Sequence, residues 1–130
     1  QILRLRSVVF VVEQECIYQD IDNKDKNAVH IFLKEKNEII AYSRVFKEKE
    51  YFENPSIGRV VVANKRRMYG VGKKIMNISI DYIKQNIKAK SIEISAQKYL
   101  KKFYSNLGFI QEGDEYLEDN IPHLRMFLII

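Results

Sequence analysis

A glycine turn surrounded by cations is the part of this sequence best suited to binding an anion. The segment Arg67-Met68-Tyr69-Gly70-Val71-Gly72 lies between a β-branched run, Val60-Val61-Val62, and a helical pattern that begins at Val71. Five cations crowd this junction: Lys65, Arg66, Arg67, Lys73 and Lys74. Lysines in a first helical turn oppose the positive end of the helix dipole. Backbone N–H groups left open by glycine at a helix start form a phosphate site, and a bound phosphate would offset that opposition. The alternative is a glycine loop with solvated lysines.

Two other phosphate-binding signatures do not fit this turn. A magnesium-dependent P-loop needs Gly-Lys followed by Ser or Thr, but Gly72 is followed by Lys73-Lys74. The dinucleotide fingerprint needs a third glycine, and Ile75 occupies that position. What remains is Arg-x-x-Gly-x-Gly between a strand and a helix, which indicates a pyrophosphate held without metal.

The composition is that of a single globular domain. The chain has 130 residues, of which 46% are hydrophobic and 30% charged. No apolar run is long enough to span a bilayer and no signal-peptide pattern opens the chain. Cys16 is the only cysteine, so an intrachain disulfide is excluded and we expect a cytoplasmic protein. With only His30 and His123 beside that thiol, we expect no metal site.

The net charge of +5 allows an anionic partner without naming one. The cations concentrate at 65–74 and 84–102, whereas Glu112, Asp114, Glu115, Glu118 and Asp119 form an acidic stretch. A nucleic-acid binder more often carries one continuous basic face. We therefore expect neither nucleic acid nor a membrane as the partner.

The hydrophobic periodicity predicts an α+β domain with one mixed sheet and helices on its faces. Residues 2–12 fit a helix, although Val8–Val12 also suits a strand, and 13–30 reads as a loop, with or without a short helix. Strands are expected at 30–33 and 38–46, as a hairpin around Lys36-Asn37, and at 57–63, 91–95, 109–110 and 124–130, with an acidic loop before the last. Helices are expected at 71–87 and 98–107, the second ended by Gly108.

The helix predicted at 71–87 carries a wide apolar arc. Its two stripes are Val71, Ile75, Ile78 and Tyr82, and Met76, Ile80, Ile83 and Ile87. A helix with so wide an apolar arc is expected to be largely enclosed. Its first turn would then be well fixed, as a phosphate site requires.

At this point the chain resembles the GNAT superfamily of acyl-CoA-dependent N-acyltransferases. Arg67-x-x-Gly70-x-Gly72 is similar to the acyl-CoA motif of that family, and Tyr104-x-x-x-Gly108-Phe109 is similar to its second motif. More narrowly, the chain resembles the ElaA-type branch, in four segments: 9–14, 18–22, 57–60 and 121–123. The resemblance covers nearly the whole chain.

The resemblance implies a GNAT-like mixed sheet that splays open at its centre, between the strands predicted at 57–63 and 91–95. Family members usually begin with a strand before the first helix, so we expect that strand to precede Gln1. The co-substrate implied is acetyl-CoA or another short acyl-CoA. Its pantetheine arm would enter the opening, and its pyrophosphate would rest on the turn at the start of the following helix.

The family likeness also assigns residues to the co-substrate. The backbone N–H groups of Met68, Tyr69, Gly70, Val71, Gly72 and Lys73 would hold the pyrophosphate, with charge added by Arg67 and by Lys73 or Lys74. Backbone groups on the strand Val60-Val61-Val62, chiefly those of Val60 and Val62, would meet the pantetheine amides, and Gln97 would contact the same arm.

Acyl transfer to an amine needs a neutral nitrogen and a proton for the departing thiolate. Tyr104 occupies the matching position for the acid; its alternative role is a core aromatic one turn from Leu100 and Leu107. Glu13 and His123 lie in segments specific to the branch and are candidates for the base, each with a structural role as the alternative.

Other polar residues leave two interpretations open. Asp20 and Asp22 would bind a cationic acceptor or cap a loop, and Arg44 and Arg59 would orient a carboxylate or simply pair with one. Cys16 is not a convincing nucleophile, because neither motif requires a thiol.

The leading hypothesis is an acetyl-CoA-dependent N-acetyltransferase acting on a small-molecule or peptide amine, as a monomer or homodimer. A non-catalytic acyl-CoA sensor or partner-binding module is the second, and a nucleic-acid-binding domain is the third. The loops 13–30, 47–56 and 112–122 carry no signal that identifies the amine.

Overall fold

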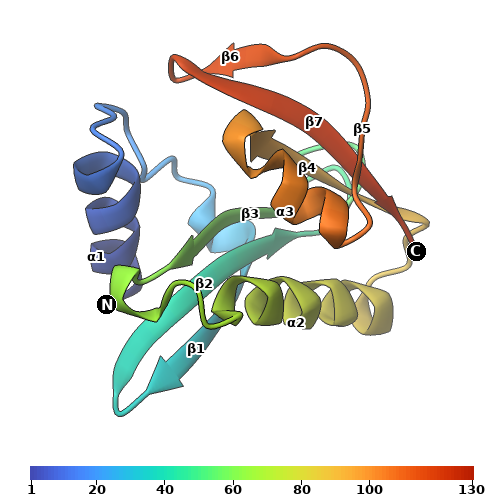
Figure 1. Cartoon of the computed structure of the whole chain (residues 1–130). Helices are drawn as coiled ribbons and strands as arrows, with labels where there is room; N and C mark the ends of the chain where they lie inside the picture. The colour runs from blue at the N-terminus through green and yellow to red at the C-terminus, as the bar shows by residue number, and fades with distance from the viewer.

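The computed structural model describes all 130 residues, Gln1–Ile130, as one sheet with helices on both faces (Figure 1). The seven strands are β1 (Val29–Glu35), β2 (Glu38–Phe46), β3 (Ser56–Val62), β4 (Ser91–Gln97), β5 (Ile110–Gln111), β6 (Tyr116–Glu118) and β7 (Ile121–Ile129). The α-helices are α1 (Ile2–Arg6), which continues as the π-helix η1 (Ser7–Glu13), α2 (Val71–Asn86) and α3 (Lys101–Asn106). Short 3₁₀ turns are η2 (Asp25–Asn27), η3 (Asn64–Arg66) and η4 (Lys98–Leu100).

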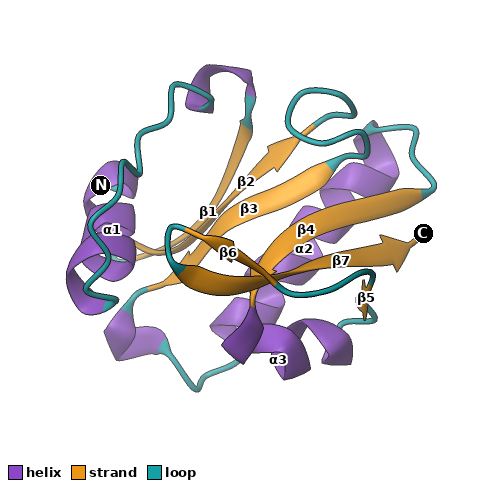
Figure 2. Cartoon of the chain, turned by 90° about the horizontal axis from the view of Figure 1, so that it is seen from above, coloured by secondary structure: helices purple, strands orange, loops and turns teal.

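The sheet consists of two halves that meet at one point. Its order is β1-β2-β3-β4-β7-β5, with β6 also paired to β7. All pairs are antiparallel except β3 with β4, which are parallel and share a single residue pair, Ser56 with Glu93. Beyond that pair the two strands separate (Figure 2). The centrally splayed α+β sheet expected from the sequence is confirmed. Where the two strands separate, the backbone groups on the facing edges of β3 and β4 do not pair with each other.

A β-bulge bends β3 beside this opening. Tyr42 pairs with Val61 and Arg44 with Gly58, so Ser43 faces two residues, Arg59 and Val60. Arg59 has φ +49°, a left-handed conformation that is uncommon for a residue other than glycine. Bulges of this kind increase local twist and re-aim a side chain. Here the bulge turns Arg59 toward the loop that follows η1.

Alternation along β2 assigns the helices to opposite faces of the sheet. Ser43 on one face hydrogen-bonds to Ser79 of α2 at 2.7 Å, and Val45 joins the main core with Met76. Tyr42 on the other face packs with Val9 and Phe10 of η1. Figure 1 shows α1 beside the β1–β3 half and α3 beside β4 and β7. The two cores therefore fix η1 and α2 on either side of β3.

Three details of the predicted elements need correction. Residues 2–13 are helical, so a strand at Val8–Val12 is wrong, because Val9 and Phe10 cover one face of the sheet while Val8 and Val12 stay exposed. The acidic loop contains β6, and β7 begins at Ile121. Asp119 and Asn120, both with positive φ, make the two-residue turn between them.

The apolar arc predicted on α2 is narrower than expected. Ile75, Met76, Ile80 and Ile83 are buried, but Ile78 is exposed. Ser79 is instead fully buried on this helix. Its hydroxyl tolerates burial because it forms hydrogen bonds with Ser43 and with the Ile75 carbonyl. The helix is held by one face and one flank rather than enclosed all round.

A buried ionic cluster ties the 13–30 segment to the sheet. Three arginines, Arg6, Arg44 and Arg59, alternate with three aspartates, Asp20, Asp22 and Asp25, at N···O distances of 2.6–3.5 Å. The hydrogen bonds from Arg44 lower the pKa of Asp22 below its usual range. Asp20 and Asp22 are thus engaged by arginines, and Arg44 and Arg59 pair with them. This cluster fixes the loop that forms one wall of the opening.

Candidate active site

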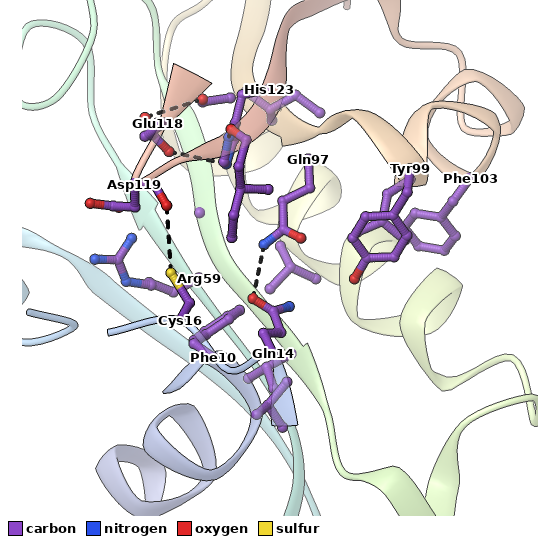
Figure 3. Close-up of a pocket in the computed structure, with 18 of the residues that line it drawn as sticks. Phe10, Gln14, Cys16, Arg59, Gln97, Tyr99, Phe103, Glu118, Asp119 and His123 are labelled. Carbon is purple, nitrogen blue, oxygen red and sulfur yellow. Dashed lines mark hydrogen bonds and ion pairs between the residues drawn. The ribbon is translucent and has the colours of Figure 1, made fainter. Parts of the chain in front are cut away.

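The space between β3 and β4 forms a cavity of about 520 Å³ (Figure 3). Its size is within the range of ordinary ligand pockets. The walls come from η1 and the loop after it, β3, β4, the start of α2, η4 with α3, and the β6–β7 hairpin. Elements far apart in sequence therefore meet around one space, and fourteen of its twenty-five lining residues are hydrophobic.

The turn before α2 presents unpaired backbone donors beside this cavity. None of the N–H groups of residues 68–73 donates to a backbone acceptor, whereas the N–H of Lys74 bonds to the Gly70 carbonyl at 3.0 Å. Gly70 has φ +73° and allows the sharp change of direction, while Met68 adopts φ +69° with a fully exposed side chain. The first turn of α2 contains no acidic residue. Six consecutive donors and the helix dipole therefore favour an anion at this position.

Arg67 is held in place by three hydrogen bonds. Its Nε donates to the Val62 carbonyl at 3.1 Å, its Nη2 donates to Glu13 Oε1 at 2.8 Å, and its Nη1 donates to Asn64 Oδ1 at 3.4 Å. Val62 and Glu13 line the cavity. The carbonyl of Val62 is therefore engaged by a guanidinium within the protein.

Tyr104 lies in α3 with its side chain in the cavity wall. Phe103 and Phe109 pack edge-on against its ring, and the residue is only 7% exposed. Burial raises the pKa of Tyr104 well above its usual value, with a smaller contribution from Tyr99. No side-chain hydrogen bond contributes to that shift. The phenol stays protonated at neutral pH and is free to donate to a group in the cavity.

A hydrogen bond between Gln14 and Gln97 bridges the cavity. Gln97 Nε2 donates to Gln14 Oε1 at 3.3 Å, which joins the end of β4 to the residue after η1. Figure 3 places this bridge between two groups of side chains. Tyr99 and Phe103 lie on one side, and Glu118, Asp119 and His123 with Cys16 and Arg59 lie on the other.

The hairpin side of the cavity holds a cluster of hydrogen-bonded polar groups. His123 Nε2 lies 3.2 Å from Glu118 Oε2, and its Nδ1 lies 2.7 Å from the Ile121 carbonyl. Ser95 Oγ donates to Glu118 Oε1 at 3.4 Å and also contacts the Tyr116 hydroxyl. Cys16 Sγ donates to the Asp119 carbonyl at 3.6 Å.

The structure brings most residues singled out in the sequence into one place. The cavity is lined by Glu13, Val60, Val61, Val62, Arg67, Gly72, Gln97, Tyr104 and His123. Met68, Tyr69, Gly70, Val71, Lys73 and Lys74 do not line it; they form the turn and first helical turn on either side of Gly72. Glu118, Ser95 and Tyr116 were not anticipated, because β6 is too short to give a periodic signal. The Asp119-Asn120 pair is the one clue to its hairpin.

Two further findings describe the molecule as a whole. No group of three or more His, Cys, Asp and Glu side chains is placed to hold a metal ion. None of the helices is long and apolar enough to cross a bilayer.

Residues 6–130 match the family model described as an acetyltransferase (GNAT) domain. The chain therefore belongs to the GNAT acetyltransferase family, whose members are acyl-CoA N-acyltransferases. Within it the chain is similar to the protein ElaA of Escherichia coli, with 39% identity over 127 residues that cover 96% of this chain and 83% of ElaA. The ElaA-type resemblance is thereby confirmed.

Solved structures agree with this assignment. The crystal structure of Escherichia coli ElaA matches with a TM-score of 0.89 and 37% identity, covering 98% of this chain and 86% of that one. An acyl-CoA N-acyltransferase from Pseudomonas aeruginosa matches with a TM-score of 0.88 and 32% identity, covering 98% of this chain and 87% of that one.

Proposed function

We propose that this protein transfers an acetyl group from acetyl-CoA to a primary amine, which attacks the thioester directly in a ternary complex. One observation carries the proposal: six unpaired backbone donors at residues 68–73 adjoin a cavity in whose wall the phenol of Tyr104 is buried. The first feature suits a pyrophosphate and the second suits a departing thiolate.

The charges beside the turn fit coenzyme A. Arg67 is already oriented by Val62 and Glu13, so little conformational entropy would be lost when it meets a phosphate. Lys73 and Lys74 are exposed in the first turn of α2, where they oppose the helix dipole. A bound pyrophosphate would supply the negative charge that this end of the helix lacks.

The separated strands suit the pantetheine arm. Ser56 and Glu93 form the single residue pair between β3 and β4, and beyond it the facing edges of the two strands are not paired with each other. Amide groups of an extended arm are able to pair with such an edge. Val60 and Val61 on β3 and Gln97 at the end of β4 line the same space and would make these contacts.

Direct attack requires few groups from the protein. A neutral amine nitrogen attacks the carbonyl carbon of the thioester, the C–S bond breaks, and the sulfur takes a proton. A free thiol has a pKa of about 8.5, so its thiolate is a moderate leaving group that needs limited help. Tyr104 keeps its proton at neutral pH, because a phenol has a pKa of about 10 and burial raises the pKa of Tyr104 further. It would donate that proton to the sulfur.

Calorimetric titration of the protein with acetyl-CoA, followed by a free-thiol assay, tests the proposal. The assay uses spermidine, lysine amide and a peptide with a free N-terminus as acceptors. We expect saturable binding with a Kd of about 1–100 μM, within the ordinary range for an enzyme substrate, and thiol release with at least one amine. Absence of saturable binding would overturn the proposal. Binding without thiol release from any amine would indicate an acyl-CoA sensor instead.

A further inference from the structure

Four side chains that line the cavity are able to accept a proton from an amine: Glu13, Glu118, Asp119 and His123. Asp119 lies exposed in the turn between β6 and β7. The Oε1 of Glu13 accepts a hydrogen bond from Arg67 at 2.8 Å. Arg67 is in turn fixed on the Val62 carbonyl at 3.1 Å. The Glu13 carboxylate therefore orients a cation beside the phosphate turn, which favours another group as the base.

The hydrogen-bond geometry of His123 shows how a proton is accommodated. The Ile121 carbonyl can only accept, so the imidazole Nδ1 that faces it at 2.7 Å carries a hydrogen. Nε2 faces Glu118 Oε2 at 3.2 Å. Two lone pairs would repel at this distance, whereas one proton between them makes a charge-assisted hydrogen bond. The pair therefore has a place for one proton between Nε2 and Oε2.

Glu118 is the member of this pair that an acceptor can reach. Its side chain is 43% exposed, compared with 7% for His123. Ser95 Oγ donates to its other oxygen, Oε1, at 3.4 Å, and Tyr116 contacts the same hydroxyl. The carboxylate is thus oriented on both sides while one face remains open to the cavity.

Several charged groups surround Glu118. His123 reaches it from β7, and Asp119 and Tyr116 are close to it on its own hairpin. Arg59 of β3 and Arg44 of β2 line a small adjoining cavity together with Glu118. Both guanidiniums are held by aspartates, Arg59 by Asp20 at 2.8 Å and Arg44 by Asp22 at 2.6 Å. The positive charges of both arginines are therefore compensated by these aspartates and not by Glu118.

We propose that Glu118 is the general base for the acceptor amine, with His123 as the positioning residue behind it. The inference rests on the proposed acetyl transfer. A proton leaves the acceptor ammonium, directly or through one water, and enters the Glu118–His123 pair. The neutral nitrogen attacks the thioester carbon, the C–S bond breaks, and the Tyr104 proton goes to the sulfur. The remaining extra proton on the nitrogen restores the phenol, and the pair releases its own proton to solvent.

Replacing Glu118 by glutamine removes the basic oxygen and keeps the shape. The Glu118→Gln variant and the wild type are compared in the thiol assay with butylamine and with hydrazine, a weaker base that is more often neutral near pH 7. We expect kcat/KM to fall about 100-fold with butylamine and about threefold or less with hydrazine, since hydrazine has a far larger neutral fraction and depends less on a base. The KM for acetyl-CoA should change less than about twofold, because Glu118 acts on the acceptor.

Glu115→Gln is the matched control, because Glu115 precedes the same hairpin and pairs with the exposed Lys98. It should behave as the wild type. Equal activity of Glu118→Gln and wild type with butylamine would overturn the inference. So would an equal loss with both amines, which would indicate a role in binding rather than in proton transfer.

Histidine NMR tests the pair without any acceptor. The chain has only His30 and His123, so isotope-labelled imidazole signals are assigned with one variant, His30→Asn. We expect the Nε2 signal of His123 to differ between the wild type and Glu118→Gln at neutral pH, with the signals of His30 unchanged. Identical His123 signals in both proteins would overturn the pairing. If the wild type releases no thiol with butylamine, hydrazine or any acceptor named above, the acetyl-transfer proposal fails, and the His123 signals still decide whether the two side chains pair.

Discussion

Arg67 and Glu13 form an ion pair of 2.8 Å that links the end of η1 to the turn before α2. The same guanidinium bonds to the Val62 carbonyl at the end of β3. One side chain therefore connects three elements around the cavity. Glu13, a candidate base in the sequence, and Arg67, a candidate phosphate ligand, are in contact with each other.

This contact leads to different expectations for two variants, each of which removes one charge of the pair. Arg67→Gln should weaken acetyl-CoA binding about tenfold, or about 1.4 kcal/mol, because a charge-assisted contact is lost. Glu13→Gln should change kcat less than about threefold, because its carboxylate orients Arg67 and takes no proton. Calorimetry and the thiol assay measure the two effects. A loss of about 100-fold in kcat for Glu13→Gln would instead identify Glu13 as the base.

Removing the hydroxyl of Tyr104 should affect turnover and not binding. Tyr104→Phe keeps the aromatic packing with Phe103 and Phe109, so the fold and the Kd for acetyl-CoA should be retained. We expect kcat to fall about 100-fold, the lower range for loss of a general acid. Tyr82→Phe in α2, away from the cavity, is the matched control and should leave kcat unchanged. Unchanged kcat in Tyr104→Phe would remove this residue from the mechanism.

The left-handed backbone at Gly70 provides a test of the phosphate turn. Gly70 and Gly113 both have positive φ, +73° and +82°, and an added Cβ would meet no atom at either position. Alanine at either site should therefore cost about 1–2 kcal/mol of stability through backbone strain alone. Only Gly70→Ala should also weaken acetyl-CoA binding, because it distorts the donors at 68–73. Equal binding by the two variants, measured by calorimetry beside thermal unfolding, would place the pyrophosphate elsewhere.

Lys73 and Lys74 should matter for affinity only where they face phosphates. The double variant Lys73→Gln/Lys74→Gln should bind acetyl-CoA about tenfold more weakly at low salt, with the difference shrinking as salt screens the charges. Lys84→Gln, at the other end of the same helix, should bind as the wild type does. Titrations at two ionic strengths give the comparison. A salt-independent difference would argue against charge as the cause.

The ionic cluster under the 13–30 segment should make the protein sensitive to acid. Hydrogen bonds from Arg44 lower the pKa of Asp22; burial alone would raise the pKa of Asp25, but its bonds to Arg6 and Arg44 outweigh burial and lower it. A depressed folded pKa gives stability that is complete above the unfolded value of about 4. That stability is lost as the pH falls from about 4 toward the folded values.

Thermal unfolding between neutral and acidic pH checks this dependence. Asp22→Asn should lower stability at neutral pH by about 3 kcal/mol, because it leaves the buried Arg44 short of a partner. It should also flatten the decline of Tm on acidification. Asp81→Asn, exposed on α2, should change neither. A wild-type Tm that does not fall below pH ~4 would contradict the pKa assignment.

Much of the fold was readable from local patterns. The glycine turn, the helix after Val71 and the stop at Gly108 depend on spacing and on backbone conformations that neighbouring residues decide. The exposed Ile78 and the short strand β6 were not readable in this way. Whether an apolar residue is covered depends on which element packs over it, and a three-residue strand is stable only against its partner β7.

The sequence by itself determined the class of protein, because the Arg67 to Gly72 turn and the Tyr104 motif each lie within a few consecutive residues. Only the tertiary structure decided the arrangement of the polar groups. Glu13 meets Arg67 across 54 positions, and Gln14 meets Gln97 across 83. Glu118 meets His123 through a hairpin of which the sequence gives little sign. Such contacts follow from the splay between β3 and β4 and from the faces that each strand presents, and these are set by packing of the whole chain rather than by any local pattern.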